Sequence, residues 1–224
     1  FTREKPSNSG GRKHIELGKV IKETFNFKMV GDRHYWQLIL SRFLYLVGIY
    51  GFQSFAQYFI RDKFPEQDPI IFTQFVMGTF VIVLIIFSLL AGSLSDRFGR
   101  KKLQVLSSII GSIGAVLLIF ANTPAQLLIY GAFMGIGLGI FLSVNWAFAN
   151  DMAPKEDAAK YMGLTNIATA GSAAVARLEG PMTDILNNAA PGQWWGWTAL
   201  FAVSAVLMLL SAVALLKVPE TRKQ

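Results

Sequence analysis

The 224 residues are 53% hydrophobic and only 16% charged, which leaves too little polar surface to cover the core of a soluble domain. The formal charge is +7, but the bases lie between long apolar segments, which argues against the basic face of a nucleic-acid-binding protein. The absence of cysteine excludes disulfide frameworks, thiol catalysis and cysteine-based zinc sites.

Six apolar segments have the length that a helix needs to cross a bilayer, about 20 residues. No alternation of apolar and polar residues runs long enough to indicate a barrel of strands. We therefore expect an all-α, polytopic membrane protein with six transmembrane helices. The expected spans are residues 36–60, 69–94, 103–121, 124–150, 161–186 and 195–217.

The expected domains are a basic cytoplasmic linker (residues 1–35), a six-helix bundle (36–218) and a cytoplasmic tail (219–224). Apolar residues between 17 and 25 share one face of a possible helix with lysines around it, which suits a helix lying on the inner leaflet. Six spans put both termini on one side, where most of the 21 bases fall. The positive-inside rule makes that side cytoplasmic and indicates an integral protein of the plasma (cytoplasmic) membrane.

The first span contains Arg42 and, on the same helical face, Gln53 and Gln57. The two amides should face the protein interior because an unpaired amide is costly in hydrocarbon. They suit contact with another helix and contact with a ligand equally well. Arg42 lies about 9 Å inside the span; we expect its side chain to extend to the inner interface, and the alternative is a functional intramembrane charge like those of the fifth span.

Between the second and third spans the chain reads AGSLSDRFGRKK, residues 91–102. Its glycines would allow a close backbone approach and a turn with positive φ. Asp96 can face a helix N-terminus, and the arginines can meet a carboxylate from another span, for which Asp151 is the obvious candidate. The residues of this expected cytoplasmic gate are Gly92, Asp96, Arg97, Gly99, Arg100 and Asp151.

The fourth span carries Gly131, Gly135 and Gly139 at four-residue spacing, which favours close packing of helices. Asn145 and Trp146 follow, deeper than an interfacial aromatic belt, and are candidates for a substrate cavity. An aromatic ring at this depth can stack on a sugar or on an apolar ligand.

The fifth span contains Arg177 and Glu179, and the Gly-Pro pair at 180–181 predicts a break in the helix. A charge within the membrane is a functional hypothesis by default. Here it indicates an outer-gate salt bridge or, equally, substrate or proton binding. Two further cavity candidates on this span are Asn166 and Thr169.

Residues 92–101 resemble the loop signature of the major facilitator superfamily at every defining position. Residues 150–164 are similar to a second loop of that fold, and VPETRK near the end is similar to the end of the second half of many members. With the basic segment before the first span, these resemblances favour the C-terminal half. They imply two six-helix bundles with substrate bound between them, and a motif Asp that caps a helix of the other half.

The resemblance implies a secondary active transporter, or half of one, that moves a small solute by alternating access as a symporter or antiporter. Its implied partners are the solute, a coupling proton or sodium ion, the other half or a second copy, and the lipid bilayer. Polar residues on the cavity spans favour a neutral polar solute. The alternative is a non-transporting six-helix subunit of a larger membrane complex. We expect no enzyme activity, cofactor or nucleic-acid partner, and His14 and His34 are too isolated for a metal site.

Overall fold

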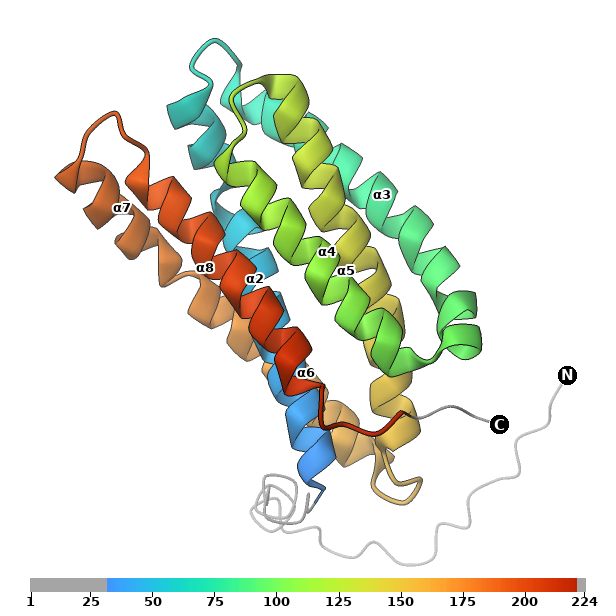
Figure 1. Ribbon diagram of the computed structural model, residues 1–224. Helices are drawn as coiled ribbons and strands as arrows, with labels where there is room; N and C mark the ends of the chain where they lie inside the picture. The colour runs from blue at the N-terminus through green and yellow to red at the C-terminus, as the bar shows by residue number, and fades with distance from the viewer. Residues whose placement is uncertain (1–31, 221–224) are drawn as a thin grey trace, which may run out of the picture. The chain divides into compact units, whose positions relative to one another are not determined.

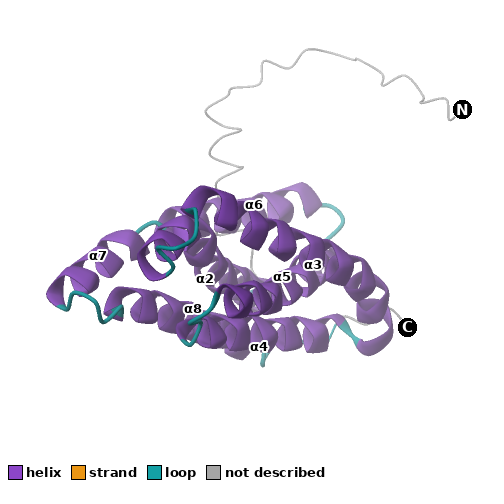
Figure 2. Ribbon diagram, turned by 90° about the horizontal axis from the view of Figure 1, so that it is seen from above, coloured by secondary structure: helices purple, strands orange, loops and turns teal. Residues whose placement is uncertain are grey.

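The computed structural model describes residues 32–220, and every regular element within that range is a helix (Figures 1 and 2). The expected interfacial helix and nearly all of the expected linker lie outside the described residues, as does most of the tail. The helices are α2 (Arg33–Lys63), α3 (Pro69–Phe98), α4 (Arg100–Ile119), α5 (Pro124–Met152), α6 (Ala158–Ala176), α7 (Glu179–Ala189) and α8 (Trp195–Ala214).

Five of these helices, α2, α3, α4, α5 and α8, are long and apolar enough to cross a membrane. The fifth expected span is instead divided into α6 and α7. The break falls at Arg177 and Leu178, slightly before the Gly-Pro pair where we expected it. The cause is still Pro181, because a proline ring clashes with the carbonyl four residues earlier, which here belongs to Arg177. The predicted all-α, polytopic fold is confirmed.

Side-chain caps decide where three of the helices begin. Asp32 accepts a hydrogen bond from the backbone N–H of His34 at 2.8 Å, so α2 starts earlier than the apolar run alone indicates. Asp68 caps α3 in the same way, with proline in the first turn. Thr123 and Gln126 form a reciprocal capping box at the start of α5.

Glycine allows α5 to pack tightly in the position between α3 and α4 that Figure 1 shows. A Cβ atom added to Gly135 would lie 2.7 Å from the carbonyl oxygen of Phe80. One added to Gly139 would collide with the carbonyl of Leu84. An added Cβ on Gly131 would make only ordinary contacts. Two of the three predicted packing glycines, Gly135 and Gly139, therefore allow the backbones of α3 and α5 to approach closely.

Polar side chains link α2 to the C-terminal helices. The hydroxyl oxygens of Ser41 in α2 and Ser211 in α8 lie 2.8 Å apart. The Tyr35 hydroxyl lies 2.8 Å from both the carbonyl oxygen of Tyr161 and the hydroxyl of Thr165 in α6. Such bonds join helices without exposing polar atoms to lipid.

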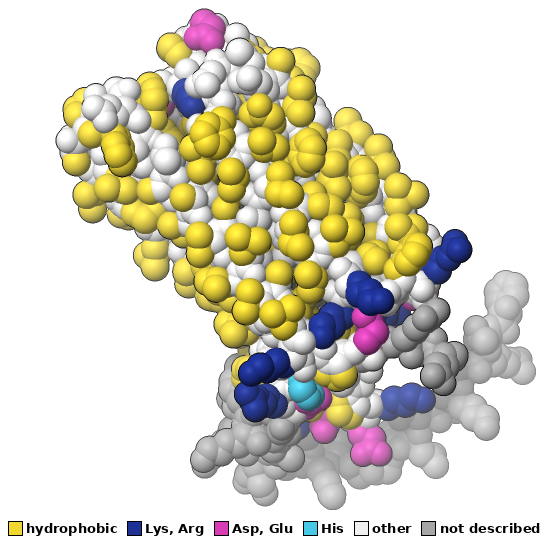
Figure 3. Space-filling view, in the orientation of Figure 1, with side chains coloured by type: hydrophobic (Ala, Val, Ile, Leu, Met, Phe, Trp, Pro, Cys, Tyr) yellow, Lys and Arg dark blue, Asp and Glu magenta, His cyan; other side chains and the backbone are white. Residues whose placement is uncertain are grey.

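Apolar and charged side chains occupy different parts of the surface along the length of the bundle. Figure 3 shows hydrophobic side chains over the middle of this face, with charged side chains gathered mainly at one end. That end carries residues 91–102, and the α6–α7 break lies toward the other. An apolar belt between polar ends suits a bundle that spans a bilayer.

Candidate functional site

Four of the predicted residues meet inside the bundle around Arg42 of α2, which is only 2% exposed. Its Nε donates to Thr169 Oγ1 of α6 at 2.9 Å, and its Nη1 donates to Asn145 Oδ1 of α5. The guanidinium carbon lies 4.6 Å from the centre of the Trp146 ring, within the range of a cation–π interaction. We call these four residues the Arg42 cluster.

The expectation that Arg42 extends to the inner interface is wrong. Acceptors on α5 and α6 hold its guanidinium inside the bundle. A hydrogen bond to a charged group contributes about 1.5–3 kcal/mol, so the two bonds offset part of the cost of burying the guanidinium. No ion pair in residues 32–220 includes Arg42, so neutral oxygens and an indole ring face its charge.

The Arg42 cluster has hydrogen-bonding capacity that the described residues do not use. Asn145 is fully buried, yet its Nδ2 has no acceptor among them. A buried donor without a partner is uncommon and calls for an explanation. Trp146, next in sequence, leaves 40% of its surface exposed. The cluster therefore combines an unused donor, which is buried in this conformation, with an accessible aromatic ring; together they would suit a ligand with hydroxyl oxygens once the donor is uncovered.

The other three cavity candidates do not join this cluster. Gln53 is half-buried and lies about 16 Å further along α2 than Arg42. Gln57 and Asn166 are exposed. Their predicted contact with a substrate remains a prediction, and it concerns parts of α2 and α6 that no other helix of the bundle fully covers.

The end of the bundle with residues 91–102 is held by an ion pair between α4 and α5. Nε of Arg100 lies 2.6 Å from Oδ2 of Asp151, and both side chains are 14% exposed. The two atoms form an ion pair without the angles of an aligned hydrogen bond. Asp96, which is 71% exposed, makes a longer contact of 3.3 Å with the same arginine. Gly99 has a φ of +99°, so this turn does use the freedom of glycine.

Arg97 does not contribute to this ion pair. Its guanidinium carbon lies 5.6 Å from the centre of the Phe98 ring, and its side chain is exposed. Gly92 would accept an added Cβ at an ordinary distance of 3.5 Å from the Ser143 hydroxyl oxygen. Of the two expected arginine contacts, the structure therefore places only Arg100 against Asp151.

Glu220 belongs to the same group, although the sequence singled out its segment only by resemblance. Its Oε1 accepts from the backbone N–H of Lys101 at 3.0 Å, in the first turn of α4. Lys101 Nζ donates in return to the carbonyl oxygen of Leu216 at 2.8 Å. A carboxylate at a helix N-terminus is favoured by the free N–H groups there. The segment after α8 therefore helps to hold the start of α4.

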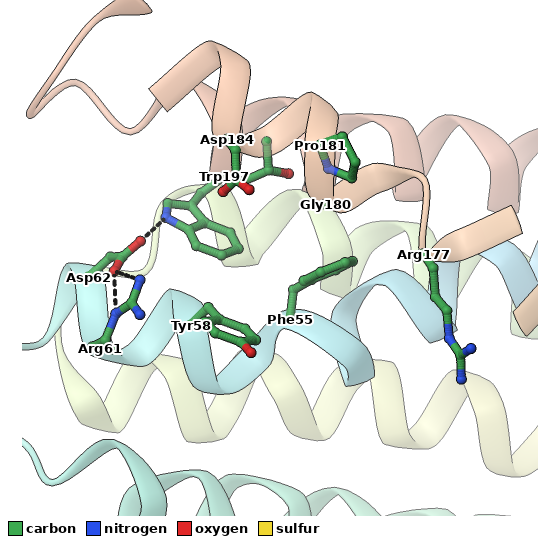
Figure 4. A pocket seen from close by; sticks show the side chains of 10 residues that line it. Phe55, Tyr58, Arg61, Asp62, Arg177, Gly180, Pro181, Asp184 and Trp197 are labelled. Carbon is green, nitrogen blue, oxygen red and sulfur yellow. Dashed lines mark hydrogen bonds and ion pairs between the residues drawn. The ribbon is translucent and has the colours of Figure 1, made fainter. Parts of the chain in front are cut away.

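Near the α6–α7 break, a pocket of about 330 Å³ lies between α2, α7 and α8 (Figure 4). Asp62 binds both Arg61, at 2.8 Å, and the indole N–H of Trp197, at 3.2 Å. Figure 4 shows the Arg177 side chain pointing away from these groups. Phe55 approaches the break closely, since a Cβ on Gly180 would lie 2.8 Å from its ring.

Glu179, the first residue of α7, is buried, and neither carboxylate oxygen has a hydrogen-bond partner in the described part of the chain. Its carboxylate fills the space above Gly51 of α2, where an added Cβ would overlap it. No ion pair joins it to exposed Arg177, so residues 32–220 do not show the outer-gate salt bridge that we considered. Over the same range, no group of three His, Asp or Glu side chains could hold a metal ion.

The family model described as "Major Facilitator Superfamily" matches residues 38–224. The chain is 26% identical over 134 residues to the "Minor myo-inositol transporter IolF" of Bacillus subtilis, covering 60% of this chain and 29% of that protein. It is 28% identical over 137 residues to the "Myo-inositol transporter 1" of Saccharomyces cerevisiae, covering 61% and 22%. The chain thus spans less than a third of the length of either relative.

Its fold resembles an inward-open structure of the xylose transporter XylE from E. coli, with a TM-score of 0.68 and 19% identity. That match covers 84% of this chain and 47% of the transporter. Another structure of XylE, with a TM-score of 0.67, is described as a proton:xylose symporter. At this identity the likeness shows the fold alone. The family match over most of its length shows that the chain belongs to the major facilitator superfamily of membrane transporters.

Proposed function

We propose that this chain supplies the C-terminal six-helix half of a secondary transporter, with both termini in the cytoplasm. The transporter moves a small polyhydroxylated solute by alternating access between two half-bundles. Family membership and the helical bundle support transport. The Arg42 cluster is the observation that carries the proposed solute site, because it combines a buried charge, an unpaired buried donor and an exposed aromatic ring.

A polyol or sugar suits the chemistry of this cluster. The apolar face of its ring can stack on exposed Trp146, and its hydroxyl oxygens can accept from Asn145 Nδ2 in a conformation of the transport cycle that uncovers this buried donor. The two curated relatives named above carry inositol transport in their names. A neutral solute also fits a site in which neutral oxygens already face the arginine.

A proton is the coupling ion that we propose, and Glu179 is the residue that we propose to bind it. It is the one buried acid in residues 32–220, and no donor or cation meets its carboxylate there. An isolated carboxylate is costly in an apolar interior, and protonation removes that cost. The proton:xylose symporter with the same fold supports this choice over sodium.

The proposed cytoplasmic gate lies at the ion pair between Arg100 and Asp151, which keeps α4 and α5 joined and positions Asp96 at the gate. Exposed Asp96 lies beside it and is free to meet a helix of the other half when the two bundles close. Opening would then separate Asp96 from that helix while α4 and α5 stay joined. Hinged motion of whole half-bundles is how alternating access operates in this type of fold.

The test is solute uptake by the native polypeptide that contains this chain, reconstituted in liposomes. We expect labelled myo-inositol or xylose to enter faster than into empty liposomes, and a labelled dipeptide to serve as a negative control. Asn145→Ala should reduce uptake at least tenfold. Asn150→Ala is the matched control, because Asn150 is an exposed residue on the same helix.

Glu179→Gln tests the coupling separately. It should leave some solute exchange but remove the response of uptake to an imposed proton gradient. An unchanged response would contradict the proton assignment alone. If none of the solutes enters and the chain stays bound to a larger complex, transport itself is contradicted and the alternative of a non-transporting subunit is favoured.

A further inference from the structure

An apolar groove of about 540 Å³ runs between α3 and α4. Both helices pack along α5 but barely against each other, and Ile136 and Ile140 of α5 line the groove between them. The walls include Leu90 and Leu94 from α3 and Leu106 from α4, which are 51%, 44% and 48% exposed. Because α3 is the least buried of the five candidate spans, this groove faces away from the bundle.

One end of the groove is basic. Phe98 and Lys102 line it there, and Lys102 is the one charged residue of the lining. The guanidinium of Arg97 lies over the Phe98 ring, 5.6 Å from its centre. Two positive charges therefore flank the end of an otherwise apolar channel.

The four bases of residues 91–102 divide into two pairs. Arg100 is held by Asp151, and Lys101 donates to a backbone carbonyl after α8. Arg97 and Lys102 are exposed and make no ion pair with any residue from 32 to 220. The two bases that no acid in residues 32–220 pairs with are thus the two at the basic end of the groove.

We propose that this groove binds a phospholipid with an anionic headgroup, from the leaflet at this end of the bundle. One acyl chain lies between α3 and α4, and the phosphate meets Arg97 and Lys102. A lipid fits the groove because an acyl chain matches its apolar lining, while a phosphate matches the two bases at one end of it. Basic residues at a membrane surface attract anionic lipid, each of them about fivefold, and two of them therefore predict a preference of roughly thirtyfold.

The test is native mass spectrometry of the full polypeptide released from detergent. The probes are phosphatidylglycerol and phosphatidylcholine with identical acyl chains, added one at a time. We expect the wild-type protein to retain phosphatidylglycerol at a concentration about thirtyfold lower than phosphatidylcholine. Lys102→Gln should reduce that preference to about fivefold, and the double variant with Arg97→Gln should remove it. Lys155→Gln, which changes an exposed base away from the groove, should keep it.

Leu106→Trp tests the apolar part of the site because the larger ring fills the groove. It should weaken retention of both lipids at least fivefold. Ile113→Trp is its control, since Ile113 is 47% exposed on the same helix but does not line the groove. Equal retention of the two lipids by the wild-type protein would overturn the proposal, as would the same loss in both control variants.

Discussion

Replacing Gly135 with alanine should loosen the contact between α3 and α5. The added Cβ would lie 2.7 Å from the carbonyl oxygen of Phe80 and 3.4 Å from its Cα. The first of these distances is shorter than real Cβ contacts, and the obstructing atom belongs to backbone. One of the two helices must therefore move. Gly78 in α3 offers a matched control, because an added Cβ there would meet nothing within 4 Å.

The two substitutions should have opposite signs. Overpacking of this kind lowers the free energy of unfolding by roughly 1–3 kcal/mol. Alanine in place of a helical glycine raises it by about 0.5–1 kcal/mol. Gly135→Ala should thus lower the free energy of unfolding by up to about 2.5 kcal/mol, with a central value of about 1 kcal/mol, and Gly78→Ala should raise it slightly. For a chain of this size, 1 kcal/mol corresponds to a Tm change of roughly 2–4 °C.

The assay is thermal unfolding of the purified variants in one detergent, followed by intrinsic fluorescence. We expect the Tm of Gly135→Ala to fall by a few degrees and that of Gly78→Ala to stay level or rise. The double variant with Gly139→Ala should fall further. If Gly135→Ala and Gly78→Ala shift the Tm equally and in the same direction, the close contact between α3 and α5 is refuted.

Three further predictions use the same unfolding assay. Asp151→Asn removes the ion-pair partner of Arg100, which is mostly buried. It should lower the free energy of unfolding by about 1–3 kcal/mol, between the values for exposed and buried ion pairs. An unchanged Tm would show that the pair does not stabilise the fold. Tyr35→Phe should cost about 1 kcal/mol, because it removes a hydroxyl that contacts α6. Tyr45→Phe should be neutral or stabilising, because its buried hydroxyl has no partner in the described residues; equal losses in both tyrosine variants would contradict this. Gly51→Ala should displace the carboxylate of Glu179 and lower the free energy of unfolding by less than Gly135→Ala does, because the obstructing atoms belong to the end of a side chain. Adding Glu179→Ala should recover that loss, and additive losses would refute the contact.

The helices were predictable because local features determine them. The Asp-Pro and Thr-Pro pairs at 68–69 and 123–124 mark two of the starts, and the apolar runs are long. The break in the fifth span was also predictable, since proline alone requires it. The contact between Arg100 and Asp151 could be anticipated because both residues lie at the same end of neighbouring spans.

The Arg42 cluster could not be predicted as a cluster. Arg42 is 103 residues from Asn145 and 127 from Thr169 in the sequence. Periodicity assigns a residue to a face of its own helix, but it does not give the rotation of that helix against its neighbours. The expectation for Arg42 treated α2 as an isolated helix in lipid, where extension to the interface is favoured. Acceptors from two other helices reversed that preference.

Solute counterflow tests most directly the claim that this chain is half of a carrier. Liposomes containing the full polypeptide are loaded with unlabelled myo-inositol and diluted into a trace of labelled solute. An alternating site predicts that label transiently accumulates inside above its equilibrium level, and that Asn145→Ala removes the overshoot while Asn150→Ala keeps it. A steady rise to equilibrium without overshoot, or no entry of label with either myo-inositol or xylose, would contradict the account.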